Sequence, residues 1–409
     1  MPQNHVHAAD PVALQYERWP YPGPVQDLSA APFDSPHMRF KDVERLYWLY
    51  WPDRERRDDL DILVAGCGTV AAAALAYLYP RSRVVGIDVS AASLENEQRL
   101  RERHGLSNLA LHHCRVEDAA SLGLTFDYIN CQGVLHHLAD PVAGLRALGR
   151  VLRTDGVISI MVYGRYGRAP VYMFQEFFRM LGLGQQSDDV RMVKEALSFL
   201  GPRHVLRRYL ELATDLHNDE GLVDTFLHAR DRPFSVSECL RLVEDAGLVF
   251  GGWEENILYH PDAQMAAGSA LRARIEALPP RQMWQAMELF RGNIGGHWFF
   301  ACRPERPAAS YTVQFDDDAF LDYVPVPRLS EARTTADGRA VVRRDPFPAL
   351  TLGQRQSAIF REIDGQRTIR QCIARSGEWS SEAVSLARRM FATLWRTGYM
   401  LFRFGRAGT

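Results

Sequence analysis

The sequence lacks any uninterrupted apolar stretch of the roughly 18 residues that a membrane-spanning helix needs. Its first residues, MPQNHVHAADPVALQYERWPYPGP, also lack the basic region and the apolar core of a signal peptide. These two absences argue against a membrane protein and against a secreted one. We therefore expect a cytoplasmic protein without a membrane partner.

An excess of charge of one sign is also lacking. The 48 lysine and arginine residues stand against 50 aspartate and glutamate residues, which gives a formal net charge of -2. Such a balance produces no global field that would attract nucleic acid or anionic lipid, so we expect neither as a partner. The 409 residues are enough for two or three domains.

Paired cysteines and metal-binding motifs are absent as well. The six cysteines are scattered and none belongs to a CxxC pair, so we expect reduced, mostly buried thiols. Thirteen histidines are present, but no HExxH motif and no His/Cys spacing of a metal site. The sequence therefore predicts no metal.

What the sequence does contain, between Leu60 and Tyr163, is an alternation of short apolar runs with amphipathic windows. This alternation is typical of an α/β protein with a parallel sheet and crossover helices. The predicted strands are residues 61–66, 82–88, 110–115, 126–132 and 156–164. The predicted helices are residues 70–79, 91–104 and 141–152.

Other segments flank this core. Residues 1–57 are rich in aromatic residues and proline, which predicts an arm or lid. Residues 165–232 interrupt the alternation with helical windows and form a helical insertion. The alternation then resumes with a helix that Ser235 caps, with Glu238 near the capping-box position, and two strands are predicted within residues 248–260 and 295–303.

The segment PERPAAS is the best linker in the chain and predicts a domain boundary near residue 303. It separates a domain of residues 58–303 from a module of residues 304–409. In that module the sequence predicts a helix over residues 352–363, a turn at Asp364 and Gly365, two more helices and a terminal strand. This order suggests a small α+β, winged-helix-like domain.

The first predicted strand ends in the turn Ala65-Gly66-Cys67-Gly68. A glycine turn between a strand and a helix lets a ligand approach the backbone, and we expect the first amides of the following helix to face that ligand. Asp88 ends the second strand, where a carboxylate can accept hydrogen bonds from both hydroxyls of a ribose. The alternative is that Asp88 caps the next helix, although Ser90 can serve as that cap.

A dinucleotide fingerprint requires a third glycine three residues after Gly68, and here that residue is Ala71. Later segments, VEDA after the third strand and CQGVLHHLADP after the fourth, complete an ordering that resembles the class I S-adenosylmethionine-dependent methyltransferase family over residues 60–163. The pieces at residues 235–303 would supply its sixth and seventh strands. With AGCGT, GVLHHLADP and QYERWPYP, the chain looks like a bacterial subgroup with a Tyr-Pro-rich arm.

This resemblance implies a Rossmann-like, seven-stranded, mostly parallel sheet that binds S-adenosylmethionine and releases S-adenosylhomocysteine. The family pattern carries the methionine, ribose, adenine and methyl-facing contacts onto Ala65, Gly66 and Gly68; Asp88 and Val89; Glu117 and Asp118; and Gln132, Gly133 and Val134. The chain departs from the family pattern at two positions. Ala65 stands where many members carry an acidic residue, and Val70 stands where many carry a third glycine. The first departure would weaken the contact with the amino group of the cofactor, and the second would narrow the turn.

Methyl transfer is an in-line displacement that mainly requires positioning, and a base helps when the acceptor is an amine or hydroxyl. His136 and His137 follow the tip of the fourth strand, and we favour His137 slightly as the base. The alternative is that both simply belong to the start of a helix. Tyr163 lies at the end of the fifth strand, at the edge of the same cleft, and is a third catalytic candidate.

Candidate substrate-binding residues come from three segments. Arg165 and Arg168 could clamp a carboxylate or phosphate, or be surface arginines around a glycine hinge. The aromatic residues of the arm could close over the site, or pack the arm onto the sheet; they are Tyr16, Trp19 and Tyr21. A polar stretch predicts either a border of the substrate site or a salt-bridged turn, and contains Asp224, His228, Asp231 and Arg232.

Four functional hypotheses follow. The leading one is a methyltransferase acting on a small molecule whose methylated atom is nitrogen, oxygen, sulfur or carbon. The second changes the acceptor to a peptide or protein that docks on the C-terminal domain, and the third is a non-catalytic protein that binds S-adenosylmethionine. A nucleic-acid methyltransferase is disfavoured, because the charge is balanced and QGVL stands where an (N/D)PP(Y/F) tetrad would be.

Overall fold

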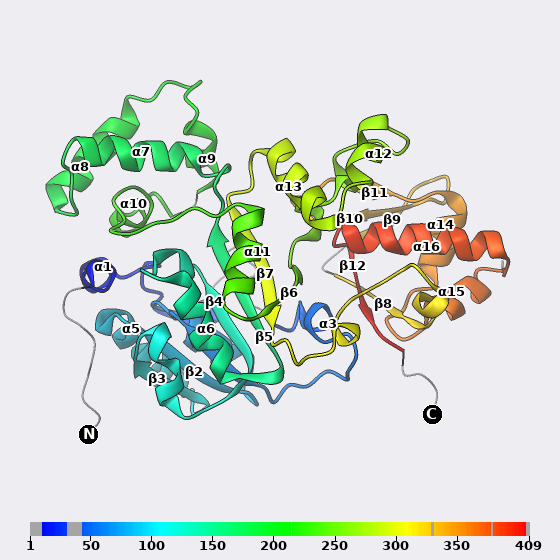
Figure 1. Cartoon of the computed structure of the whole chain (residues 1–409), viewed down its shortest axis with the longest axis horizontal. Coiled ribbons are helices and arrows are strands. Elements are labelled where there is room, and N and C mark those ends of the chain that lie inside the picture. Colours follow the sequence, from blue (N-terminus) through cyan, green and yellow to red (C-terminus); the bar gives the residue numbers. More distant parts are fainter. Residues whose placement is uncertain (1–9, 31–42, 214, 329–330, 378, 406–409) are drawn as a thin grey trace. The chain divides into compact units, whose positions relative to one another are not determined.

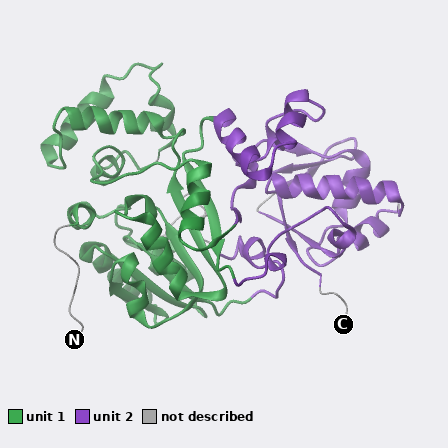
Figure 2. Cartoon of the chain, in the orientation of Figure 1, with its two compact units in different colours: residues 1–41, 57–250, 292–304 green, residues 42–56, 251–291, 305–409 purple. Residues whose placement is uncertain are grey.

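The computed structural model of the chain describes residues 10–30, 43–213, 215–328, 331–377 and 379–405. The chain divides into two compact units (Figure 2): unit 1 contains residues 1–41, 57–250 and 292–304, and unit 2 contains residues 42–56, 251–291 and 305–409. The boundaries predicted at residues 57/58 and 303/304 lie beside two breaks between the units, whereas residues 42–56 and 251–291 belong to unit 2. The three-part division into arm, domain and module stays a prediction.

A seven-stranded sheet in the order β3-β2-β1-β4-β5-β7-β6 organises the protein (Figure 1). Its strands are β1 Asp61–Ala65, β2 Arg83–Asp88, β3 Leu109–His113, β4 Phe126–Gln132, β5 Leu152–Tyr163, β6 Val249–Trp253 and β7 Gly296–Cys302. The first five strands pair in parallel, and β7 is antiparallel to β5. The predicted mostly parallel, Rossmann-like sheet is confirmed.

The strands form here because their residues are apolar on both faces. Ile62, Leu63 and Val64 of β1 are buried, as are nearly all residues of β2 and β4, which is typical of a parallel strand covered on both sides. The start of β5 differs from the prediction by four residues, since β5 begins at Leu152 rather than at residue 156. A register shift between Phe126 and Tyr128 of β4 lets β5 pair from Leu152 onward.

Helices pack against this sheet (Figure 1), with α4 against β2, α5 against β3 and α6 against β5. They are α4 Ala71–Leu78, α5 Ala91–His104 and α6 Pro141–Val151, close to the predicted ranges. Ser90 caps α5 by accepting from the amide of Ser93 at 3.0 Å, and Asp140 caps α6. The helix α11, Val236–Asp245, begins with the predicted capping box of Ser235 and Glu238.

The insertion forms a helical subdomain with its own core. Its helices are α7 Ala169–Met180, α8 Ser187–Ser198, α9 Arg207–Leu212 and α10 Asp219–Phe226. Val171, Phe178 and Phe226 are buried together between α7 and α10. These helices confirm the helical character that the sequence predicted for the insertion. Sequence analysis missed α10, which the side chain of Asn218 caps.

Unit 2 contains two small sheets, of strands β11-β10-β9 and β12-β8, with helices around a separate core. Its helices are α3 Tyr47–Tyr50, α12 Ala270–Glu276, α13 Pro280–Arg291, α14 Gln354–Arg361, α15 Ile369–Arg375 and α16 Ser381–Arg396. Its strands are β8 Val324–Pro327, β9 Glu331–Thr334, β10 Ala340–Arg343, β11 Leu350–Thr351 and β12 Met400–Arg403. The predicted turn lies between α14 and α15, where Gly365 has a φ of 75°.

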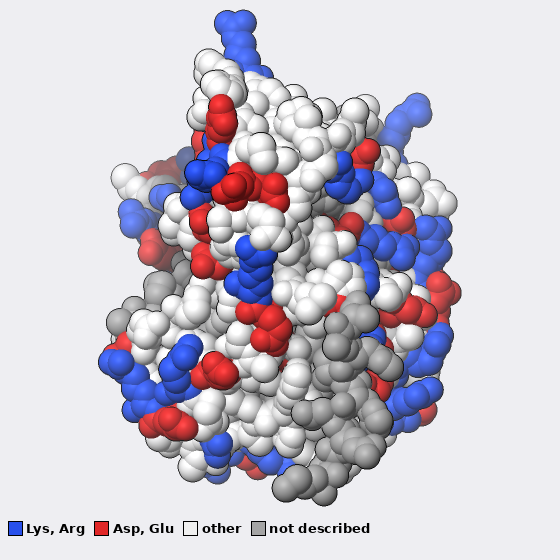
Figure 3. Space-filling model, turned by 90° about the vertical axis from the view of Figure 1, so that its left-hand side faces the viewer, with Lys and Arg blue, Asp and Glu red and all other residues white. Residues whose placement is uncertain are grey.

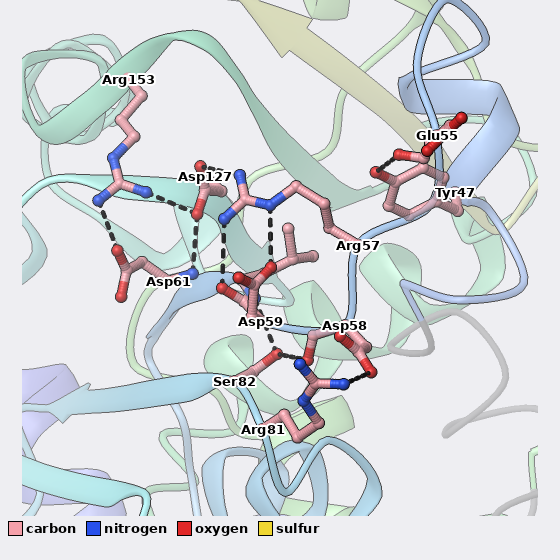
Figure 4. A network of polar contacts seen from close by, with 11 residues as sticks. Tyr47, Glu55, Arg57, Asp58, Asp59, Asp61, Arg81, Ser82, Asp127 and Arg153 are labelled. Atoms are coloured by element: carbon pink, nitrogen blue, oxygen red, sulfur yellow. Dashed lines mark hydrogen bonds and ion pairs between the residues drawn. The ribbon is translucent and has the colours of Figure 1, made fainter.

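A network of ion pairs lies at the ends of β1, β4 and β5 that are opposite the glycine turn (Figure 4). Asp127 accepts from the amide of Asp61 at 2.9 Å and from Arg153 at 2.6 Å, and Arg153 also contacts the carboxylate of Asp61. These contacts hold three neighbouring strands together at the edge remote from the site. Among the described residues, every helix falls short of the length and apolar character that a membrane crossing requires.

Candidate cofactor and acceptor site

The turn after β1 requires glycine at two positions. Gly66 and Gly68 have φ values of 71° and 57°, a left-handed conformation that other residues rarely adopt. A Cβ on Gly66 would lie 2.4 Å from Cγ2 of Val134, and a Cβ on Gly68 would lie 2.8 Å from the carbonyl oxygen of Tyr21. The turn therefore lies directly against the tip of β4 and against the N-terminal segment.

Asp88 lies beside this turn at the end of β2. Its Oδ2 accepts from the amide of Gly68 at 2.8 Å, and its Oδ1 accepts from the amide of Ser90 at 2.9 Å. Burial raises the pKa of Asp88, and these backbone hydrogen bonds oppose that rise. An ionised carboxylate offers about four lone-pair positions, so Asp88 keeps acceptor capacity for two ribose hydroxyls.

One expectation about the following helix is wrong. The sequence predicted that the first amides of α4 face the ligand, but the carboxylate of Glu97 accepts from the amides of Ala72 at 2.9 Å and Ala73 at 2.7 Å. The buried Glu97 comes from α5 and satisfies the amide groups that a helix leaves unpaired at its N-terminus. The amides of Ala72 and Ala73 are therefore not available to a ligand.

The other residues that were predicted to bind the cofactor lie at or just after the ends of neighbouring strands. Glu117 and Asp118 lie in the 3₁₀ segment η2, Val116–Leu122, where Glu117 accepts from Arg115 at 3.2 Å and Asp118 is exposed. Gln132 ends β4 and donates to Ser159 at 2.9 Å, and Gly133 follows with a φ of 81°. His113 of β3 contacts the carbonyl oxygen of Val89 at 2.8 Å. All of these residues lie at the carboxyl ends of β2, β3 and β4.

The N-terminal segment of residues 10–30, with the helix α1 Pro11–Arg18, binds to the glycine turn and to α5. Thr69 donates to the carbonyl oxygen of Pro22 at 2.7 Å, and Ser90 donates to that of Tyr16 at 3.1 Å. The carboxylate of Glu17 accepts from the amides of Ala91 and Ala92. Residues of this N-terminal segment therefore lie directly against the glycine turn.

The same segment is bonded to the insertion. Tyr16 donates to Asp224 at 2.9 Å, Trp19 donates to the carbonyl oxygen of Gln185 at 3.2 Å, and Tyr21 donates to Asp215. Gln15 accepts from Gln185 at 2.8 Å and from the amide of Ala229 at 2.9 Å. The three aromatic residues predicted for the arm thus all bond to the insertion, and so does Gln15, which sequence analysis missed.

A buried polar cluster lies where the insertion meets the tips of β4 and β5. Its members come from the segment η3 Leu135–His137, from β5, from the start of α7, from α10 and from the stretch that follows α10. They are His136, His137, Tyr163, Arg168, Asp224, His228 and Asp231. The structure therefore brings together all three predicted catalytic candidates, one predicted arginine and three residues of the polar stretch.

His136 is fully buried, with its ring centroid 4.1 Å from that of Tyr163 and 4.1 Å from that of His137. Within the described part of the chain, neither of its ring nitrogens has a hydrogen-bond partner. Burial lowers the pKa of His136 well below its usual value, with smaller contributions from His137 and Arg168. His136 is therefore a neutral imidazole with free nitrogens inside the cluster.

The hydrogen bonds of the next two histidines assign their tautomers. His137 donates from Nδ1 to the carbonyl oxygen of Arg230 at 2.8 Å, so its lone pair is on Nε2. The amide of Arg230 donates to Nδ1 of His228 at 3.0 Å, so Nε2 of His228 carries the proton and donates to the hydroxyl of Tyr16 at 3.1 Å. Tyr16 in turn donates to Asp224, whose pKa burial raises to about 7.

Two groups in this cluster have the spacing of metal ligands. His136, His137 and Asp231 form one group, and His137, Asp224 and His228 form the other, with ligand atoms within 4.8 Å of one another. Hydrogen bonds already engage both nitrogens of His228, and His137 keeps only Nε2. These contacts suit a neutral hydrogen-bonded network better than a metal site.

The two predicted arginines have different surroundings. Arg168 is 4% exposed, its guanidinium carbon lies 3.6 Å from the ring centroid of Tyr163, and it donates to Tyr209 at 2.7 Å. Arg165 donates to Glu238 at 2.7 Å and has a side chain that is 42% exposed. The predicted pair is therefore separated, with only Arg168 in the cluster.

A family model described as a methyltransferase domain matches residues 56–196. Among curated proteins, the chain is 34% identical over 272 residues to an uncharacterized protein of Synechococcus sp.. The aligned region covers 65% of this chain and 64% of that protein. The chain is 37% identical over 87 residues to the tRNA 5-carboxymethoxyuridine methyltransferase of Escherichia coli, which covers 21% of this chain and 33% of that enzyme. The chain spans less than two thirds of the length of these relatives.

Among solved structures, the chain is similar to PKMT2 from Rickettsia typhi, with a TM-score of 0.65 and 15% identity over 89% of this chain and 76% of that one. The structure of PKMT2 in complex with AdoHcy gives a TM-score of 0.62 and 14% identity over 90% and 76% of the two chains. At this level of identity the likeness concerns the fold.

Proposed function

We propose that this chain, which contains a methyltransferase domain of the class I S-adenosylmethionine-dependent family, transfers a methyl group to a small molecule bound in the polar cluster. The cofactor, S-adenosylmethionine, supplies an electrophilic methyl group on a sulfonium. The matching family model and the fold support this activity. The observation that carries it is the pairing of the glycine turn with Asp88 at the carboxyl edge of the sheet.

The residues at this edge suit the cofactor. Gly66 and Gly68 let the turn lie close to Val134 and to the carbonyl oxygen of Tyr21, and Asp88 has acceptor capacity for the ribose. By analogy with the family pattern, we propose that Glu117 and Asp118, which follow β3, contact the adenine. The methyl-facing contacts fall on Gln132, Gly133 and Val134, which lead directly into the segment that holds the two adjacent histidines.

The acceptor would lie in the cluster, where His136 serves as the base. His136 is neutral and has two free ring nitrogens, so it can take a proton from an amine or hydroxyl that attacks the methyl group. The sequence favoured His137 slightly; we place His136 first because neither of its ring nitrogens has a partner among the described residues, and His137, with the lone pair of Nε2, is the second candidate. The bonds between α1 and the insertion would close the site and exclude water.

Replacing Asp88 by alanine tests the cofactor site. The variant should bind S-adenosylmethionine at least about tenfold more weakly, because a buried carboxylate that accepts two hydroxyls contributes 1.4 kcal/mol or more. Isothermal titration calorimetry measures the affinity, and Asp188→Ala, an exposed aspartate of α8, is the matched control. An Asp88 variant with a native circular dichroism spectrum and unchanged affinity would refute the ribose assignment.

A second candidate acceptor is a peptide or protein, with the C-terminal module as a docking surface. One observation favours a peptide acceptor, but on the insertion rather than on the C-terminal module: large apolar side chains of α7 are exposed, Met173 by 59%, Phe177 by 43% and Met180 by 79%. Clusters of exposed apolar residues often mark sites of protein contact.

Labelled S-adenosylmethionine distinguishes these alternatives when it is incubated with the protein and a fractionated cytoplasmic extract. Label in the low-molecular-weight fraction is expected for a small acceptor. Label on polypeptides would replace our first proposal with the second. Binding of the cofactor without transfer to any fraction would identify a non-catalytic binding protein.

A further inference from the structure

Arg168, at the start of α7, has a guanidinium group that is fixed in the polar cluster. Its plane lies over the ring of Tyr163, with 3.6 Å between the guanidinium carbon and the ring centroid. Its Nη1 donates to the hydroxyl of Tyr209 at 2.7 Å. Stacking and this hydrogen bond together hold the group in one orientation, so little side-chain freedom remains to be lost when a ligand binds.

The other edge of this guanidinium has no hydrogen-bond partner. Within the described residues, Nε and Nη2 of Arg168 are both buried and neither donates to a protein atom. These two N–H groups point in the same direction from one edge of the plane, which is the geometry that binds both oxygens of a carboxylate. Buried donors without acceptors are costly, so such an edge is expected to have a ligand.

Asp231 does not satisfy this edge. Its Oδ2 lies 3.8 Å from Nη2 of Arg168, which is too long for a hydrogen bond, and it accepts instead from Gln175 at 3.0 Å. The hydroxyl of Tyr172 lies close enough to Arg168 to oppose the rise that burial causes in the pKa of Tyr172, but no hydrogen bond of good geometry joins the two groups. Oδ1 of Asp231 and the ring nitrogens of His136 are also buried without a described partner. Unsatisfied donors and acceptors thus gather in one cluster, as in a binding site for a small polar molecule.

We propose that the edge of Arg168 formed by Nε and Nη2 binds a carboxylate group of the methyl acceptor, so that the substrate is a small carboxylic acid. This inference rests on the proposed function, which places the acceptor in the cluster. A singly charged, planar anion suits the site better than a phosphate, because Asp231 and Asp224 lie close to Arg168 and would repel a dianion. His136, in the same cluster, then contacts the part of the acceptor that receives the methyl group.

Ligand-observed NMR titrations of the full chain with acetate, acetamide and inorganic phosphate test this inference. Acetate should bind, and acetamide, which has the same shape without the charge, should bind at least about tenfold more weakly. Arg168→Gln should weaken acetate binding by at least about tenfold, as should Arg168→Lys, which keeps the charge but loses the planar edge. The matched control is Arg179→Gln, an exposed arginine of α7 paired with Glu176, and it should bind acetate like the native chain.

Several results would overturn the inference. These are no acetate binding by the native chain, equal binding of acetate and acetamide, tighter binding of phosphate, or native acetate affinity in both Arg168 variants. A peptide with a free C-terminal carboxylate that binds far more tightly than acetate would overturn the small-molecule assignment. Binding of S-adenosylhomocysteine to the native chain, measured separately, distinguishes the two proposals. Its absence would refute the cofactor site, whereas acetate binding reports only on Arg168.

Discussion

Asp224 is the residue whose burial most directly predicts a pH dependence. Its pKa is about 7 in the folded chain against a usual 3.8, chiefly because burial disfavours the charged form. The unfolded chain loses this proton near pH 4 and the folded chain near pH 7, so the folded state binds more protons between these values. Stability should therefore fall as pH rises through this window, by up to about 4 kcal/mol from this residue.

The substitution Asp224→Asn should remove most of that dependence. Asparagine keeps an oxygen that can accept from Tyr16 and carries no charge at any pH. Denaturant unfolding at about pH 5 and about pH 8 measures the two stabilities, and the variant should show the smaller difference between them. Equal differences in the variant and the native chain would contradict the assigned titration.

His136 should control the rate of transfer without affecting the cofactor. His136→Ala should lower kcat by about 100-fold or more, the usual contribution of a general base, while the affinity for S-adenosylmethionine stays native. Because the pKa of His136 lies well below its usual value, the acid limb of the pH-rate profile should also fall below pH 6.5. A variant with native kcat would exclude His136 as the base.

At the scale of elements, the contact between α1 and the insertion should govern exchange of the nucleoside. Tyr16→Phe removes the hydrogen bonds to Asp224 and His228 but keeps the ring, so the segment over the glycine turn should open more readily. The dissociation rate of S-adenosylhomocysteine, followed by stopped flow, should rise by about tenfold. Leu14→Ala on the exposed side of α1 is the control and should leave that rate unchanged.

The ion pairs at the opposite edge of the sheet should affect stability alone. Asp127→Ala leaves the amide of Asp61 without its acceptor and removes one of the two carboxylates that Arg153 binds, which should lower the free energy of unfolding by about 2 kcal/mol. Chemical denaturation measures the loss, and Asp59→Ala, at an exposed aspartate of the same network, should cost less. A changed affinity for S-adenosylmethionine in Asp127→Ala would show that the two edges are coupled.

Across the whole molecule, the sequence predicted what local patterns determine. The boundaries of α5 and β4 were predicted as observed, because capping residues and strands buried on both faces leave clear patterns in a short stretch of sequence. Contacts between distant residues could not be predicted in this way. Examples are the cap that Glu97 of α5 provides for α4 and the hydrogen bond between Tyr16 and Asp224, which are 208 residues apart. Only the packed fold shows that these residues meet.

On the face drawn in Figure 3, basic and acidic side chains are interspersed, and no large area carries one sign. A nucleic-acid substrate would be expected to meet a continuous basic surface, so this face offers no support for one.

If the chain is a methyltransferase, as we propose, the position of Tyr21 and Pro22 over the glycine turn should affect the kinetics of turnover. A bound nucleoside would then be released only after the N-terminal residues move away from the turn. This release step can be slower than methyl transfer. The first round of methylation after mixing would then be fast and the later rounds slower. A burst of product equal in amount to the enzyme would show that departure of the spent nucleoside sets the speed.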